Sequence, residues 1–179
     1  MHTKGWSERA LYLAVALATL AASGPTPAGT VSGTLPAPGV VWISDGSTPA
    51  PSTNAVITQK DRHFLPDVAV VTSGTIVRFR NDDNIEHSVY SISDADRFDL
   101  GIYEPGPGKD ITFAKSGVIA IRCHIHRSMH ATLVVVDGPY TRVETAHETW
   151  TLTGVRPGHH VLHTWTPVTG ETAADVEVR

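Results

Sequence analysis

The chain has 179 residues, which is enough for one domain or for one domain with a small appendage. Its 41% hydrophobic content, with 15 glycines and 12 prolines, is typical of a turn-rich globular protein and excludes a disordered or fibrous one. The formal net charge of −4, with no run of basic residues, argues against a nucleic-acid partner.

The N-terminal segment has the pattern of a secretory signal. Lys4 and Arg9 precede the apolar run Ala10–Ala22, which is shorter than the roughly 20 residues needed to span a bilayer and is followed by small residues and prolines. We therefore predict that residues 1–28 are a signal peptide, that the protein is periplasmic or otherwise exported, and that no membrane span remains after cleavage. An uncleaved N-terminal anchor is the alternative.

Beyond the signal, short apolar runs alternate with clusters of Gly, Pro, Asn and Asp, and helical periodicity is nearly absent. This pattern predicts an all-β sandwich. The expected strands are Thr30–Leu35, Val40–Ser44, Asn54–Gln59, Asp67–Thr72, Thr75–Arg80, Ser88–Ser93, Lys109–Ala114, Gly117–Cys123, Ala131–Val136, Glu148–Thr153, His159–Thr164 and Thr172–Val178.

Two polar segments separate the central strands. Residues 81–86 form a turn-rich loop that leads into His87. Residues 91–107 contain four acidic side chains and are expected to form a long surface loop.

The only cysteine, Cys123, ends an apolar strand. Alternation along that strand places Ile119, Ile121 and Cys123 on the inward face and Arg122 on the outward face. A single cysteine cannot form an internal disulfide, and a lone exported thiol is open to oxidation unless it is buried or bound to metal. Cys123 is therefore a candidate metal ligand.

The C-terminal region has a different pattern. Trp150–Gly158 followed by His159–Thr164 predicts a hairpin, which is too small to fold alone. The two leading strands complete a second small sandwich with it, or else the hairpin is a simple appendage of the main sheet. The predicted divisions are a signal (1–28), N-terminal strands (29–53), a metal-binding domain (54–137) and an accessory β segment (138–179).

The strongest motif is Cys123-x₂-His126-x₂-Met129, with His87 lying 36 residues before the cysteine. A thiolate and a thioether together with two imidazoles select copper, with His₂Cys in a trigonal plane and Met as a weak axial ligand. Structural zinc usually takes four Cys or His ligands and hydrolytic zinc keeps a water position, so Met129 argues against both.

The sequence gives little support for a nucleophilic role of Cys123. A Cys123 nucleophile with His124 or His126 as base lacks an accompanying oxyanion or orienting residue, so we expect no enzyme activity. His124 and His130 are expected to be solvated. The remaining histidines of the C-terminal segment are expected to lie on an exposed strand and not in a second metal site: His147, His159, His160 and His163.

Residues 54–136 resemble the cupredoxins, the small blue-copper electron-transfer proteins. The resemblance rests on the Cys123–Met129 loop, which is like that of amicyanin, on the loop from Asn81 to Val89, and on Gln59, Phe64 and Pro66. The wider pattern is similar to plastocyanin-like proteins of methylamine utilisation. The segment around Gly154–Gly158 resembles a carboxypeptidase-regulatory-like β-sandwich.

The resemblance implies a Greek-key cupredoxin sandwich that binds one type 1 copper ion. His87, Cys123 and His126 would be the equatorial ligands and Met129 the axial ligand, and the backbone N–H of Ser88 would donate to the Cys123 sulfur. Many relatives have proline where this chain has Arg127, which changes the charge beside the His126 edge where the family meets its redox partner.

The expected function is therefore single-electron transfer between redox partner proteins by a monomeric, exported copper protein. The alternative is a periplasmic copper-binding protein for copper storage, delivery or resistance, with a more open site. A third hypothesis is a binding module whose copper site is degenerate.

Overall fold

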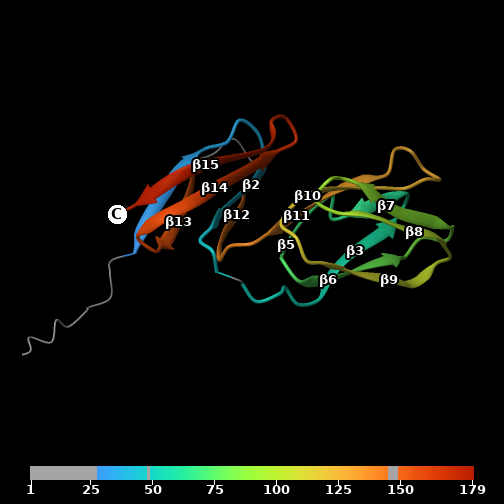
Figure 1. The fold of residues 1–179 in the computed structure, drawn as a ribbon. Helices are drawn as coiled ribbons and strands as arrows, with labels where there is room; N and C mark the ends of the chain where they lie inside the picture. Colours follow the sequence, from blue (N-terminus) through green and yellow to red (C-terminus); the bar gives the residue numbers. More distant parts are fainter. Residues whose placement is uncertain (1–27, 48, 145–148) are drawn as a thin grey trace, which may run out of the picture.

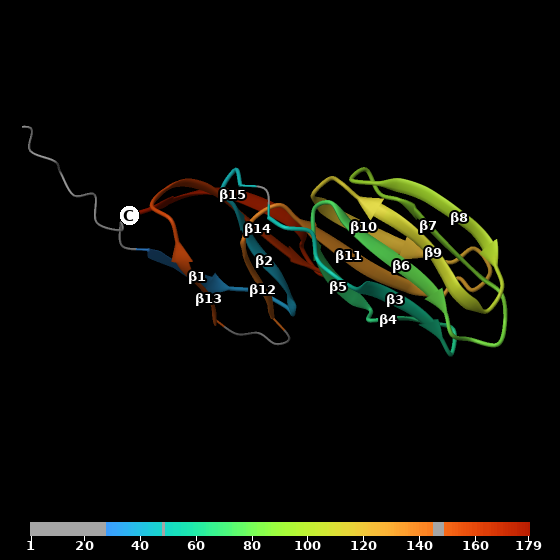
Figure 2. The same ribbon diagram turned by 90° about the horizontal axis from the view of Figure 1, so that it is seen from below.

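The computed structural model describes residues 28–47, 49–144 and 149–179, and within these ranges the protein contains fifteen β-strands and no helix. The all-β prediction is therefore confirmed. None of the described residues belongs to a helix that could cross a membrane. The predicted signal lies outside the described residues, apart from residue 28. The strands form two lobes placed end to end (Figures 1 and 2).

The larger lobe is a sandwich of two sheets. The four-stranded sheet has the order β4 (His63–Leu65), β3 (Ala55–Lys60), β6 (Thr75–Asn81), β9 (Gly106–Phe113). The five-stranded sheet has the order β5 (Val68–Thr72), β11 (His130–Val136), β10 (Gly117–Arg122), β7 (His87–Ile92), β8 (Arg97–Tyr103). The pairs β3–β6 and β5–β11 are parallel, and the other pairs are antiparallel.

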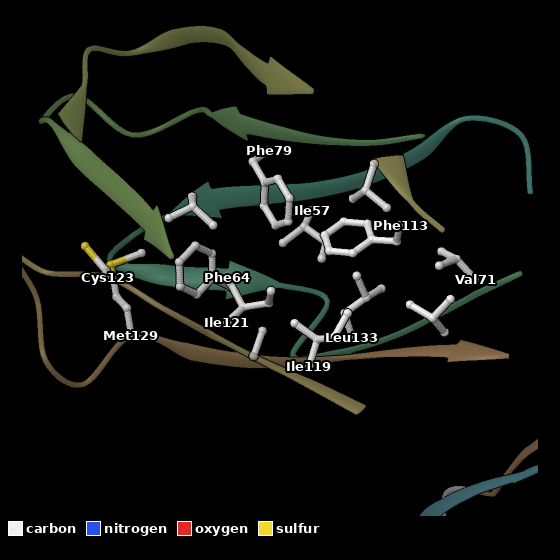
Figure 3. Close-up of a cluster of buried hydrophobic side chains, with 14 residues drawn as sticks. Ile57, Phe64, Val71, Phe79, Phe113, Ile119, Ile121, Cys123, Met129 and Leu133 are labelled. Carbon is white, nitrogen blue, oxygen red and sulfur yellow. The ribbon is translucent and has the colours of Figure 1, made fainter. Parts of the chain in front are cut away.

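The core of this lobe fills the space between the two sheets. Side chains that alternate strictly between inward and outward directions form this core. β6 is buried at every second residue, and β10 places Ile119 and Ile121 inward with Arg122 outward. Cys123 and Met129 continue this core at one end, beside Phe64, while Val71 lies toward the other end (Figure 3). The inward direction predicted for Cys123 is confirmed, since only 3% of the residue is exposed.

The segment 91–107 is not the long loop that was expected. Most of it is strand: β7 ends at Ile92, β8 occupies Arg97–Tyr103, and β9 begins at Gly106. Phe98 and Leu100 pack on the core and alternate with exposed polar residues, so the acidic side chains of this segment masked a period-2 pattern. The short strands β4 and β12 were also not expected.

The smaller lobe is built from strands on both sides of the larger one in the sequence. One of its sheets pairs β1 (Gly29–Thr34) with β13 (Thr149–Val155). The other has the order β12 (Tyr140–Glu144), β2 (Gly39–Ser44), β14 (Gly158–Thr166), β15 (Gly170–Val178). Its core includes Val41, Ile43, Trp150 and Leu152.

A third apolar cluster joins the lobes. Val40, Trp42 and Trp165 of the smaller lobe pack with Val134 and Val136 of β11. The opposite end of β11 follows the loop that carries Met129. Since a strand rises about 3.3 Å per residue, the five residues from Met129 to Val134 place roughly 16 Å of chain between the metal-ligand candidates and the smaller lobe.

Candidate metal centre

The structure brings three of the four candidate ligands together at the far end of the larger lobe. His87 begins β7, Cys123 directly follows β10, and His126 lies in the loop before β11. Their ligand atoms lie within 4.8 Å of one another. Within the described ranges, this is the single group of three or more His, Cys, Asp or Glu side chains placed to hold a metal ion.

His87 is fixed by a carboxylate behind its ring. The ring is fully buried, and its Nε2 lies 3.0 Å from an Oδ of Asp83. The pKa of Asp83 is lowered to about 2, first because the backbone N–H of Arg62 donates to it and then because His87 does. An ionised Asp83 can only accept, so Nε2 carries the proton and Nδ1 presents its lone pair to the site.

The loop that holds Asp83 is ordered by Asn81. The Asn81 amide donates to the carbonyl of Ile85 at 2.9 Å, and its side-chain oxygen accepts from the backbone N–H of Asp83 at 3.1 Å. These bonds pair backbone polar groups within the turn, and the chain then enters β7 at His87. Sequence reasoning missed the Asp83–His87 contact, although the loop itself was identified.

Cys123 lies in a ring of hydrogen-bond donors. Burial is the largest single influence and opposes ionisation, but the backbone N–H groups of His126 and Ser88, the Ser88 hydroxyl and the Ile125 N–H together lower the Cys123 pKa to about 7. The Ser88 hydroxyl lies 3.6 Å from the sulfur and accepts the backbone N–H of His124 at 2.8 Å. The N–H contact of Ser88 that the resemblance implied is therefore present, and the hydroxyl adds a second one.

His126 faces His87 across the site. The two Nδ1 atoms are 3.2 Å apart, and the rings meet edge to face with centroids 4.9 Å apart. Burial first, and then the nearby His87, lower the pKa of His126, which favours the neutral imidazole that a metal requires. His126 is partly exposed, whereas His87 and Cys123 are buried.

Met129 closes the loop. Its backbone N–H donates to the carbonyl of His126 at 3.0 Å, and the residue is only 1% exposed. The sulfur atoms of Met129 and Cys123 lie at the same end of the core (Figure 3). A soft thioether is thus available beside the three closer ligand atoms.

The chemistry of these residues fits copper. Two imidazole Nδ1 atoms facing one another, a thiolate stabilised by four donors and a buried thioether are soft and borderline ligands that suit copper and do not suit the oxygen-preferring cations Mg²⁺ and Ca²⁺. His87, Cys123 and His126 would hold the ion, with Met129 beside them.

The other histidines are placed differently. His124 bonds Asp99 at 2.9 Å and stacks on Tyr90, and His130 approaches the Ser128 carbonyl at 2.8 Å, so neither joins the group.

The expectation of an exposed C-terminal strand is wrong at two of its three described histidines. His159 is exposed, but His160 is buried and His163 stacks on Trp42. The reason is that β14 is covered on both faces, by the core of its own lobe and by the contact between lobes. His147 lies outside the described residues.

No protein-family model matches the chain, and no curated protein matches it. Solved structures similar to it include a purple cupredoxin from Nitrosopumilus maritimus, 21% identical over 46% of this chain and 100% of its own, with a TM-score of 0.42. A copper-containing nitrite reductase from Thermus scotoductus is 23% identical over 52% of this chain and 24% of its own, with a TM-score of 0.45. Amicyanin from Paracoccus versutus is 17% identical over 54% and 97%, with a TM-score of 0.44.

Proposed function

We propose that this chain is an exported type 1 copper protein that carries single electrons between redox partners. The observation that carries the proposal is the convergence of His87, Cys123 and His126 within 4.8 Å, with donors around the sulfur that lower the pKa of Cys123 to about 7. In this assignment the three would hold the ion and the buried Met129 would be a weaker fourth ligand. A bound copper ion would supply a one-electron couple between Cu(II) and Cu(I).

The surrounding residues support fast exchange by holding the ligands still. Asp83 fixes the ring of His87, the donors around Cys123 stabilise negative charge on its sulfur, and the Met129 N–H ties the loop to His126. His87, Cys123 and Met129 are buried, which limits the access of water to the site. The partly exposed His126 is the ligand through which we expect electrons to enter or leave.

The strand pairing supports a division of the chain into two domains. We assign metal binding to residues 54–137, inserted between the halves of an accessory sandwich formed by 29–53 and 138–179. Since roughly 16 Å of chain separates that sandwich from Met129, we assign none of the ligands to it. Residues 1–28 are assigned as the export signal.

The deciding experiment is a visible spectrum after addition of Cu(II) to the purified protein. We expect an intense thiolate-to-copper charge-transfer band that disappears in Cys123→Ser. His130→Ala is the matched control, because His130 directly follows Met129 but lies outside the ligand group, and it should keep the band. Circular dichroism of each variant checks that the fold is intact.

Copper binding with only faint d–d bands in the unaltered protein would contradict electron transfer and favour copper storage or delivery. Failure to bind copper at all would favour a binding module with a degenerate site.

A further inference from the structure

A pocket of about 430 Å³ lies on the outer face of the five-stranded sheet, behind Cys123. Its lining residues come from β7, from the end of β10 and from the ligand loop: Tyr90, Ile92, Arg122, Cys123, His124 and Arg127. Arg122 is in register with Tyr90, which is in register with Asp99 of β8, so these side chains share this outer face. The pocket therefore opens on the outer face of the sheet, and Cys123 is the one candidate metal ligand that also lines it.

Two guanidinium groups in this pocket have no acidic partner within the described ranges. Arg122 and Arg127 are both exposed and take part in no hydrogen bond or ion pair there. By contrast, Arg78 and Arg80 of the same lobe are paired: Arg78 makes two 2.7 Å bonds to Asp110, and Arg80 binds Asp82 at 2.6 Å. The pocket thus concentrates uncompensated positive charge in a chain whose net charge is −4.

The one carboxylate tied to the pocket wall is already engaged. Asp99 accepts from Nε2 of His124 at 2.9 Å and from the backbone N–H of Gly101 at 2.8 Å. His124 is also stacked on Tyr90, with ring centroids 3.9 Å apart and an interplanar angle of 3°. The contacts among Asp99, His124 and Tyr90 hold this wall in place. Asp99 therefore does not pair with Arg122 or Arg127, and their guanidinium groups are available to a ligand.

The apolar residues of the pocket point to a protein ligand. Ile92 is 70% exposed, Tyr90 lies beside it, and Ile125 of the neighbouring loop is 42% exposed. Tyrosine, arginine and exposed aliphatic side chains gathered on one patch are the composition of protein interfaces. Arginine in addition favours carboxylates, which it binds through paired N–H groups.

We propose that the pocket between Arg122 and Arg127 docks an acidic surface of the redox partner, with partner carboxylates bound by the two guanidiniums. This inference rests on the proposed function and names the chemistry of the partner. A partner held there would contact Cys123, which lines the pocket, whereas His126 does not line it. Because surface charges are screened within about 8 Å at physiological salt, these two local charges outweigh the mild negative charge of the whole chain at this patch.

The test uses a hexaglutamate peptide titrated into the purified, ¹⁵N-labelled protein at low salt. We expect saturable amide shifts confined to residues 90–92 and 122–127, and weakening by added salt. The double variant Arg122→Gln/Arg127→Gln should bind the peptide at least tenfold more weakly. The matched control Arg78→Gln/Arg80→Gln removes the same charge from the opposite sheet and should bind nearly as well as the unaltered protein.

Three results would overturn the inference: equal weakening in both double variants, shifts that map to another surface, or inorganic phosphate binding the pocket as tightly as the peptide, which would mark a small-anion site. Its failure is distinguishable from failure of the proposed function. If the peptide does not bind but the charge-transfer band is intact, only the proposed docking surface is contradicted. If the peptide binds but the band is absent, only the proposed electron transfer is contradicted.

Discussion

The two lobes differ in how completely their buried polar side-chain atoms are hydrogen-bonded. Among the described residues, six buried side-chain nitrogen or oxygen atoms have no hydrogen-bond partner, and only one of them, Oε1 of Gln59, lies in the larger lobe. The other five lie in the smaller lobe: Nε1 of Trp42, Oδ2 of Asp45, Nε1 of Trp150, Nδ1 of His160 and Nδ1 of His163. Of these atoms, Oδ2 of Asp45 lies 3.5 Å from the guanidinium of Arg156, and Nδ1 of His163 lies 3.5 Å from the carboxylate of Glu171.

The difference reflects what each lobe has to hold. In the larger lobe the buried polar groups form a linked network: Tyr103 accepts from Gln59 and donates to the Phe79 carbonyl, while Asn81 orders the loop before His87. Such a network specifies one geometry, which a metal site needs. The smaller lobe is held mainly by tryptophans and aliphatic side chains. The apolar contact area of the tryptophan rings offsets the cost of their unpaired N–H groups. We therefore expect the larger lobe to be sensitive to small changes in backbone and hydrogen bonding, and the smaller lobe to loss of apolar volume.

The largest effect is expected for Gly108→Ala in the larger lobe. Gly108 has φ +78 and sits in a bulge of β9, where an added Cβ would lie 1.8 Å from the Phe79 carbonyl oxygen and 2.7 Å from the Cα of Arg80. Both contacts are with backbone, so β6 and Asn81 must move. We expect a loss of about 5 kcal/mol of unfolding free energy, measured by denaturant titration.

Gly101→Ala is the control for that substitution. Gly101 also has a positive φ, of +66, but an added Cβ would meet nothing within 4 Å. It should cost only the backbone strain of about 1–2 kcal/mol. Equal losses in the two variants would show that strain alone, and not the close strand contact, makes this lobe sensitive.

Trp165→Ala tests whether the lobes depend on one another. Trp165 is buried in the cluster with Val134 and Val136, so its removal leaves a cavity that costs about 3–5 kcal/mol. Because this cluster joins the lobes, we expect calorimetry to show two separate transitions in place of one. Leu152→Ala, in the core of the smaller lobe alone, should destabilise that lobe without separating the transitions. One cooperative transition for Trp165→Ala would mean that other contacts couple the lobes.

Tyr103→Phe tests the network of the larger lobe. Burial raises the pKa of Tyr103 to about 12, so its hydroxyl remains a donor across the ordinary range of pH. Its removal leaves the buried amide of Gln59 and the carbonyl of Phe79 without their partner, at a cost of about 1–3 kcal/mol. Trp150→Phe in the smaller lobe removes an N–H that has no hydrogen-bond partner. Loss of this N–H should therefore lower the unfolding free energy by less than loss of the Tyr103 hydroxyl does.

A double variant separates the network from simple loss of a hydroxyl. Gln59→Leu combined with Tyr103→Phe removes both partners, so it should be less destabilised than the sum of the two single variants, in thermal unfolding of all four proteins. Strict additivity would indicate that the two side chains act independently.

Alternation and ligand chemistry explain which features the sequence could predict. Ile119, Ile121 and Cys123 share a face because the side-chain period of a strand is two residues, and the structure buries all three. The strand β8 was missed because its inward residues Phe98 and Leu100 are interleaved with charged ones.

The partners of the ligand candidates are harder to predict than the candidates themselves. The residue that supports His87 is one of several acids and amides in the 81–86 loop, and only the folded turn of Asn81 selects Asp83. The Ser88 hydroxyl likewise reaches Cys123 through the pairing of β7 with β10, a contact between residues far apart in the sequence. The metal-ligand roles of His87, Cys123, His126 and Met129 remain predictions that the copper spectrum tests.

The smallest expected effect concerns Asp45 in the smaller lobe. Burial is the largest influence on its pKa and acts to raise it, but hydrogen bonds from the Ser47 hydroxyl and N–H, with the nearby charges of Arg156 and His160, bring the pKa below its ordinary value. A carboxyl whose pKa is lower in the folded state stabilises the fold above the pKa it has when unfolded, near 3.9, and this contribution disappears as the pH falls through the lower folded value. The melting temperature of Asp45→Asn should therefore lie slightly below that of the unaltered protein at pH 6, and the gap should close below about pH 4. In a Ser47→Ala background, which lacks the strongest contact that lowers the Asp45 pKa, Asp45→Asn should lower the melting temperature at pH 6 by a smaller amount. A difference in melting temperature between Asp45→Asn and the unaltered protein that persists unchanged into acid would show that Asp45 contributes through packing and not through its charge.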